Sequence, residues 1–157
     1  MRVNSASIAV MFLVATSQLA LPPHLVGCWG VGIPYDLQQP VGLNEGQEAK
    51  IRKLKIRITK DHVVVCGKEI PIGSLNVEEV SPKEFLARYS FLPERVALRG
   101  THIAEVTINA FQSSNACGDF GDPGTHLFVS DGKVVMEVGN DYFPLRKEEK
   151  ISKKGTE

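Results

Sequence analysis

The sequence predicts a mainly β protein that folds as an antiparallel up-and-down β-barrel of about eight strands with one or two short helices. Several segments alternate apolar and polar side chains with the period of two that a half-buried strand requires. Tight-turn sequences separate them, and Asp131-Gly132 is among the strongest hairpin signals. Eight or nine such strands suit a barrel, because closure removes exposed sheet edges. An open sandwich is the alternative.

The first half of the chain contains three predicted strands and one helix. Residues 25–35 alternate around Trp29 and form the first strand. After a Pro-Gly break, Asn44 and Gln47 have the spacing of a capping box, which predicts a helix over 45–53. Residues 54–59 and 62–66 alternate on either side of Lys60-Asp61 and predict a hairpin.

The second half begins with a strand over 69–80 that Pro71 and Gly73 interrupt, which places it at an edge or a bend. Ser81-Pro82 followed by Glu84 predicts a second helix start. Residues 101–111 form the clearest strand of this half, and a polar loop follows at 112–124. The last strands form a meander, at 125–129, 134–138 and 142–146.

Residues 1–20 are predicted to be a signal peptide. Arg2 precedes an apolar run over 8–15, which is shorter than the roughly 20 residues that span a bilayer. Small residues around Ser17 and at Ala20 offer cleavage points. We therefore expect an exported protein, periplasmic or secreted and without a transmembrane span. Its domain covers 24–147, and a disordered charged tail covers 148–157.

A lipoprotein signal is the alternative reading of the N-terminus. Leu25-Val26-Gly27-Cys28 has the residue types of a lipobox, in which Cys28 would carry a lipid anchor. Pro22 and Pro23 interrupt the apolar region just before the box, which disfavours this reading. Both readings predict export.

Composition limits the partners. A chain of 157 residues with 43% hydrophobic and 23% charged residues has the size and composition of one globular domain. Lys plus Arg and Asp plus Glu number 18 each, so no basic excess points to nucleic acid as a partner.

The three cysteines are Cys28, Cys66 and Cys117. In an oxidising compartment two of them are expected to pair. We predict a Cys66–Cys117 disulfide, because both lie at strand ends or in loops whereas Cys28 lies within a strand. Zinc is disfavoured, because the chain has no C-x-x-C or H-x-x-x-H spacing.

The two ends of the predicted barrel carry short motifs. Gly27-x-Trp29 opens the first strand, and Tyr142-Phe-Pro-Leu-Arg146 closes the last one. This combination resembles the calycin (lipocalin-like) barrels, and in particular a group of small exported bacterial members. The resemblance implies that Trp29 plugs one end of the barrel and that Arg146 packs across it. It also implies a binding module.

The expected ligand is a small apolar or amphipathic molecule in the barrel mouth. Candidate binding residues face inward by their period, namely Ile33, Tyr35, Ile56, Ile58, Val106 and Ile108. The alternative is a filled barrel that acts on a protein partner through loop 112–124, where Phe120 is the candidate exposed aromatic. No catalytic, metal or cofactor site is predicted, because no nucleophile elbow or phosphate-binding loop occurs in the sequence.

Overall fold

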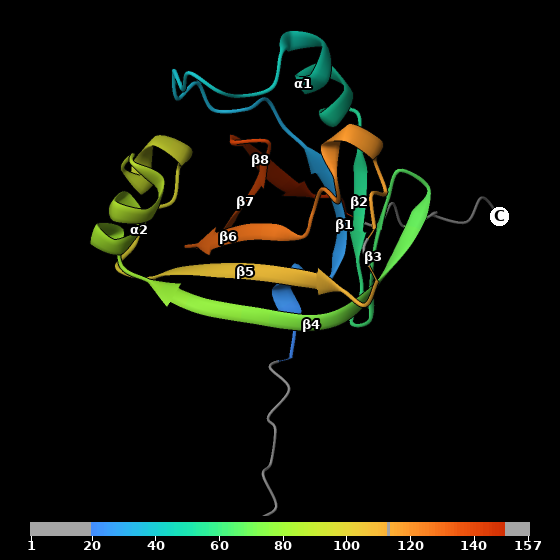
Figure 1. Cartoon of the computed structure of the whole chain (residues 1–157). Coiled ribbons are helices and arrows are strands. Elements are labelled where there is room, and N and C mark those ends of the chain that lie inside the picture. The colour runs from blue at the N-terminus through green and yellow to red at the C-terminus, as the bar shows by residue number, and fades with distance from the viewer. Residues whose placement is uncertain (1–19, 113, 150–157) are drawn as a thin grey trace, which may run out of the picture.

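The computed structural model describes residues 20–112 and 114–149, and it shows a closed barrel of eight antiparallel strands in the order β1 to β8 (Figure 1). Each strand pairs with its neighbours in the chain, and β8 pairs with β1. The predicted fold class is confirmed. The strands are β1 Gly27–Val31, β2 Lys55–Ile58, β3 His62–Val65, β4 Lys68–Val80, β5 Ile103–Ala110, β6 His126–Ser130, β7 Lys133–Val138 and β8 Asp141–Lys147.

Two α-helices interrupt the strand order, α1 Glu45–Ile51 and α2 Pro82–Tyr89. The capping box predicted at Asn44 is formed, and the helix start predicted at Ser81 is also a capping box. Asn44 Oδ1 accepts from the Gln47 amide at 3.0 Å, and Ser81 Oγ accepts from the Glu84 amide at 3.3 Å. Three short 3₁₀ helices complete the set, η1 Pro23–Leu25, η2 Pro93–Val96 and η3 Gly118–Phe120.

The first strand is shorter than the alternation of residues 25–35 predicts. β1 ends at Val31 and pairs with Ile56 and Lys147 through Trp29. Pro34 has no amide hydrogen to donate, so the regular pairing with β8 cannot continue through it. The backbone rejoins β8 at Tyr35, whose amide donates to the Tyr142 carbonyl at 2.9 Å.

Two apolar clusters lie on opposite sides of the barrel wall. The inner cluster fills the barrel and includes Trp29, Ile56, Val106 and Phe143. The outer cluster packs α2 and η2 against the outer face of β5 to β8, at the left of Figure 1. This outer packing explains why the closing strands are apolar on both faces, since a buried sheet face needs apolar side chains.

A disulfide joins Cys66, at the turn between β3 and β4, to Cys117 in the loop that follows β5. Their Cα atoms are 5.5 Å apart, and 51 positions separate them in sequence. The predicted pairing is confirmed. Cys28 has a free thiol and is exposed.

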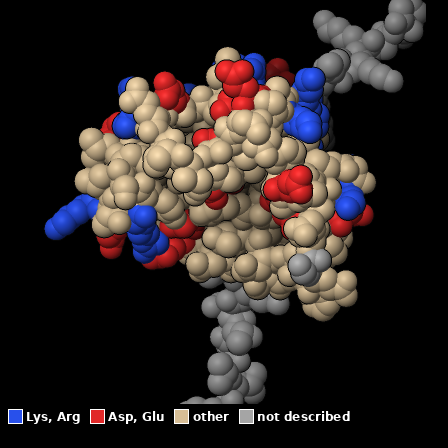
Figure 2. All heavy atoms as spheres, turned by 45° about the horizontal axis from the view of Figure 1, so that its top comes forward, with Lys and Arg blue, Asp and Glu red and all other residues tan. Residues whose placement is uncertain are grey.

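The predicted signal peptide lies outside the described residues except for Ala20, and so does most of the predicted tail. Glu148, at the start of that tail, is ordered onto the barrel, because its amide donates to the Cys28 carbonyl at 2.8 Å. None of the helices in the described ranges is long and apolar enough to cross a membrane. Figure 2 shows acidic and basic side chains interspersed over one face of the molecule, as the balanced composition leads one to expect.

Candidate functional site

A mainly apolar hollow of about 910 Å³ opens at the base of the barrel. The N-terminal segment, the turn between β2 and β3, and the middle of β4 enclose it. In Figure 1 the N-terminal segment reaches the barrel from below, close to β4. The lining residues are Ala20, Leu21, Pro23, Val26, Lys60, Asp61, Ile72, Gly73, Ser74 and Leu75.

A bulge in β4 shapes this hollow. The register between β4 and β5 shifts between Ile72 and Ser74, where the strand passes from pairing with β3 to pairing with β5. Gly73 allows the close approach of the two strands, because a Cβ there would lie 2.7 Å from the Cα of Phe111. The Ile72 amide donates to the Asp61 carbonyl at 2.8 Å, which joins the bend to the turn between β2 and β3.

The hollow combines apolar walls with polar groups. Ile72 and Leu75 belong to the inner face of β4 and are only half-buried, so part of their apolar surface faces the hollow. Lys60 and Asp61 supply one charge of each sign from the turn. Ser74 Oγ accepts from Asn109 Nδ2 at 3.1 Å and keeps its own proton to donate. Such a lining suits an amphipathic molecule.

The barrel interior beyond the hollow is filled by side chains. Four of the six predicted ligand residues, Ile56, Ile58, Val106 and Ile108, point inward and are at most 3% exposed. A water-sized void beside them would leave them accessible surface, so these side chains pack against one another. These four side chains belong to the packed barrel core, and none of them is among the residues that line the hollow.

The other two predicted ligand residues are not in the interior, which corrects that prediction. Ile33 is 67% exposed. Tyr35 packs against the outer cluster, and burial raises its pKa. Their alternation with Trp29 is lost because β1 ends before Pro34. Both line a second, more polar groove of about 600 Å³ between the loop after β1, α1 and Asp141.

Trp29, which the resemblance assigns to the plug of the barrel, contacts Leu25. The indole is 5% exposed, and its Nε1–H donates to the Leu25 carbonyl at 2.9 Å. Leu25 itself is fully buried in the inner cluster. The Leu25 carbonyl, at the end of η1, therefore binds the only polar atom of the tryptophan side chain.

The cation over this indole is Lys147, whereas the resemblance implied Arg146. Lys147 pairs with Trp29 across β8 and β1, so both side chains leave the sheet on the same face. Its Nζ lies 5.5 Å from the ring centroid. Arg146 pairs with Gly30 and points to the opposite face, where it is exposed. The predicted partner of the indole was wrong by one position, because neighbouring residues of a strand point to opposite faces of the sheet.

Gly27 lies close to the Lys147 side chain that covers the Trp29 indole. Its φ of +151° is one that residues with a Cβ rarely adopt, and a Cβ there would lie 2.7 Å from Cε of Lys147. The glycine of the Gly27-x-Trp29 motif thus leaves room for the lysine stem that crosses the indole.

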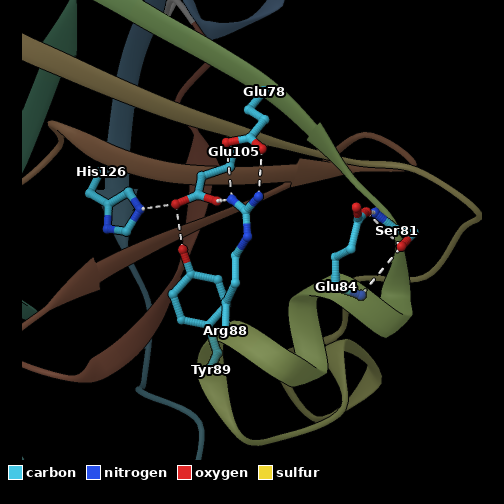
Figure 3. Close-up of polar contacts among 7 residues, drawn as sticks. All are labelled: Glu78, Ser81, Glu84, Arg88, Tyr89, Glu105 and His126. Carbon is cyan, nitrogen blue, oxygen red and sulfur yellow. Dashed lines mark hydrogen bonds and ion pairs between the residues drawn. The ribbon is translucent and has the colours of Figure 1, made fainter.

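A polar network lies on the outer face of the barrel, under α2 (Figure 3). Glu105 of β5 accepts from Arg88 Nη1 and from the Tyr89 hydroxyl, both on α2, and it bonds His126 Nε2 at 3.0 Å. The other ring nitrogen of His126 lies 3.1 Å from Glu137 of β7. Arg88 also pairs with Glu78 of β4. Four strands and a helix thus meet around Glu105.

The protonation of this network follows from its contacts. Burial lowers the pKa of His126, but the hydrogen bonds that its ring donates to Glu137 and Glu105 outweigh the effect of burial, and the net pKa is raised. Burial raises the pKa of Glu137, whereas the bond to His126 and the Asn140 amide lower it more, so its net pKa is lowered. His126 and Glu137 therefore form an ion pair at mildly acidic pH.

The sequence did not reveal this network. The period of β5 places Glu105 on the outer face, but His126 follows a polar loop and could be read as part of it. Only the pairing register, Thr107 opposite His126 and Leu127 opposite Met136, brings the histidine between the two carboxylates. A register across a loop of fifteen residues has no local sequence signal.

Loop 112–124 closes back onto the barrel. Asp122 accepts from the Ala116 amide at 2.7 Å, and Phe120 is half-buried against the inner cluster. Phe120 is therefore not the exposed aromatic that the sequence suggested. Phe111, just before the loop, is 76% exposed. In the described part of the chain, no group of three or more His, Cys, Asp or Glu side chains could hold a metal ion.

Comparisons of the chain with protein-family models, with curated proteins and with solved structures found no match. The resemblance to lipocalin-like barrels accordingly rests on the strand topology.

Proposed function

We propose that this protein is a binding module whose hollow beside β4 takes a small amphipathic molecule. The hollow itself is the observation that carries the proposal. Its volume of about 910 Å³ lies in the range of roughly 300–1,000 Å³ typical of small-molecule sites. The apolar walls would hold the apolar part of the ligand, with Lys60, Asp61 and Ser74 available to its polar part.

The packed interior restricts how such a ligand binds. Ile56, Ile58, Val106 and Ile108 leave no room in the barrel core, so the ligand would lie between Leu21 and Leu75 at the surface end of the hollow. A shallow site of this kind favours reversible binding over permanent enclosure, since part of the ligand stays in contact with water.

The experiment uses 1-anilinonaphthalene-8-sulfonate, an amphipathic dye that fluoresces when it leaves water. Leu75→Asp places a negative charge in the hollow, and Ile33→Asp places the same charge in the second groove. We expect wild type and Ile33→Asp to bind the dye with equal affinity and Leu75→Asp to bind at least about tenfold more weakly, because a carboxylate is costly to bury and repels the sulfonate of the dye. Equal binding by all three proteins, or loss only in Ile33→Asp, would reject the hollow as the site.

A second candidate function is a surface-acting interaction module, and two observations favour it. The core is filled, and Phe111 exposes 76% of its surface beside loop 112–124. Large exposed aromatic side chains are enriched at protein interfaces. A Phe111→Ser variant with unchanged dye binding but lost partner binding would support this function over the first.

We also propose that the protein is exported and keeps the segment that follows the predicted signal peptide. The Cys66–Cys117 disulfide supports an oxidising compartment. Cleavage before Cys28, as a lipid anchor requires, would remove the buried Leu25 and the carbonyl that binds Trp29. The mass of the mature protein tests this: it should include Leu25 and carry no lipid.

A further inference from the structure

The network around Glu105 connects the pH of the solution to the packing of α2. Glu105 is shared between the barrel and the helix, and its side chain is only 14% exposed. On the barrel side it meets His126, and on the helix side it meets Arg88 and Tyr89. Any change in the charge of His126 is therefore felt by a carboxylate that also holds the helix.

The geometry of His126 makes its two protonation states unequal. Both ring nitrogens face carboxylate oxygens, at 3.0 Å in Glu105 and 3.1 Å in Glu137. An imidazolium donates to both carboxylates, whereas a neutral imidazole has one N–H and turns its other nitrogen lone pair toward a carboxylate. Loss of the proton thus removes one hydrogen bond and one positive charge from the middle of the network.

The remaining charged and titratable groups around the histidine do not replace that charge. Glu105 faces it from β5 and Glu137 from β7, and Tyr142 of β8 lies near both carboxylates. Among the described residues, Arg88 is the one cation besides His126 that pairs with Glu105, and it is already shared with Glu78 of β4. The Tyr89 hydroxyl is neutral, because burial and its bond to Glu105 raise its pKa.

We propose that protonated His126 stabilises the packing of α2 against the barrel, so that this packing depends on pH. Its doubly bonded imidazolium holds Glu105 where Glu105 binds Arg88 and Tyr89, and loss of the proton loosens the helix from the barrel. The helix loosens without leaving the barrel, because Phe85 and Val96 stay anchored in the outer cluster, each with no exposed surface. The face that becomes more accessible contains the aromatic rings of Phe128 and Tyr142.

The test follows two signals in the same protein by NMR between pH 5.5 and 8.5. The ring carbons of His126 report its proton, and amide-exchange protection factors over residues 85–90 report the opening of α2, corrected for the intrinsic pH dependence of exchange. We expect α2 protection to fall by roughly fivefold with the same midpoint as the His126 titration, since a charged hydrogen bond is replaced by a weaker one. Amides of β1 and β2 serve as the internal reference and should not follow that midpoint.

Two variants test whether the proton of His126 affects α2 through Glu105. In Glu105→Gln, His126 still titrates against Glu137, but α2 protection should no longer follow it. In His126→Gln, α2 protection should stay at the level of the alkaline wild type at every pH, which keeps the test valid if Glu105→Gln does not fold. Wild-type protection that ignores the His126 midpoint, or that follows the same midpoint in either variant, would overturn the proposal.

Discussion

The Nζ of Lys147 lies 5.5 Å from the ring centroid of Trp29 and donates a hydrogen bond of 3.1 Å to the carbonyl of His24. One side chain at the end of the last strand thus fastens both the indole of the first strand and the short helix that precedes it. The barrel closes because β8 pairs with β1, and Lys147 adds a side-chain connection at the same place. The N-terminal segment, which also forms one wall of the hollow, is held by this connection and by Leu25.

Replacing the plug should destabilise the whole barrel. Trp29→Ala removes a large buried aromatic ring, and the free energy of unfolding should fall by about 3–5 kcal/mol. Trp29→Phe keeps most of the packing and loses the bond to Leu25, so it should lose less. Urea denaturation measures both. An unchanged midpoint for Trp29→Ala would show that the indole does not hold the barrel closed.

Substitutions of Lys147 and of its neighbour Arg146 provide a matched comparison. Lys147→Met keeps the stem of the side chain but removes the cation above the indole and the bond to His24, so stability should fall by about 0.5–1 kcal/mol. Arg146→Met should change it less, because that side chain is exposed on the other face. A larger effect at Arg146, measured by the same denaturation, would contradict the assignment of Lys147.

The disulfide should stabilise the protein through the loop that it closes. Because Cys66 and Cys117 have a sequence separation of 51, the loss of the crosslink should lower the free energy of unfolding by about 3–4 kcal/mol. The double variant Cys66→Ser/Cys117→Ser, compared with oxidised wild type, measures this. Cys28→Ser is the control and should show no comparable loss, and similar losses in both proteins would argue against the crosslink as the cause.

The His126–Glu137 pair predicts a specific pH dependence of stability. The pKa of His126 is raised on folding, so its contribution is fully present below its ordinary value of about 6.5 and is lost as pH rises through the folded value. The pKa of Glu137 is lowered, so its contribution is present above about 4.5 and is lost as pH falls through its folded value. The stability difference between wild type and His126→Gln should therefore be larger at pH 5.5 than at pH 8.5. A difference that grows with pH would refute the ion pair.

Local patterns account for most of the fold. The capping box at Asn44, the helix start at Ser81, the tight turn at Asp131-Gly132 and the interruption at Gly73 all depend on a few adjacent residues, and the structure has each of them where the sequence predicts it. The Cys66–Cys117 pair was predicted because both residues lie at strand ends or in loops, whereas Cys28 lies within a strand. That placement of each cysteine was also read from the residues next to it.

Features that depend on long-range register were missed. The assignment of Arg146 was wrong by one position, because a single step along a strand turns a side chain to the opposite face. Ile33 and Tyr35 were placed inside because the alternation seemed to continue past Pro34. The hollow itself is formed by the N-terminal segment, a turn and a bulge, three segments whose meeting no local pattern predicts.

Native mass spectrometry of the protein purified from its own exported fraction tests the binding function most directly. Wild type should carry an additional small mass that disappears on denaturation, and Leu75→Asp, purified in the same way, should carry none. The absence of any additional mass on folded wild type, or its equal presence on Leu75→Asp, would contradict a ligand site in the hollow.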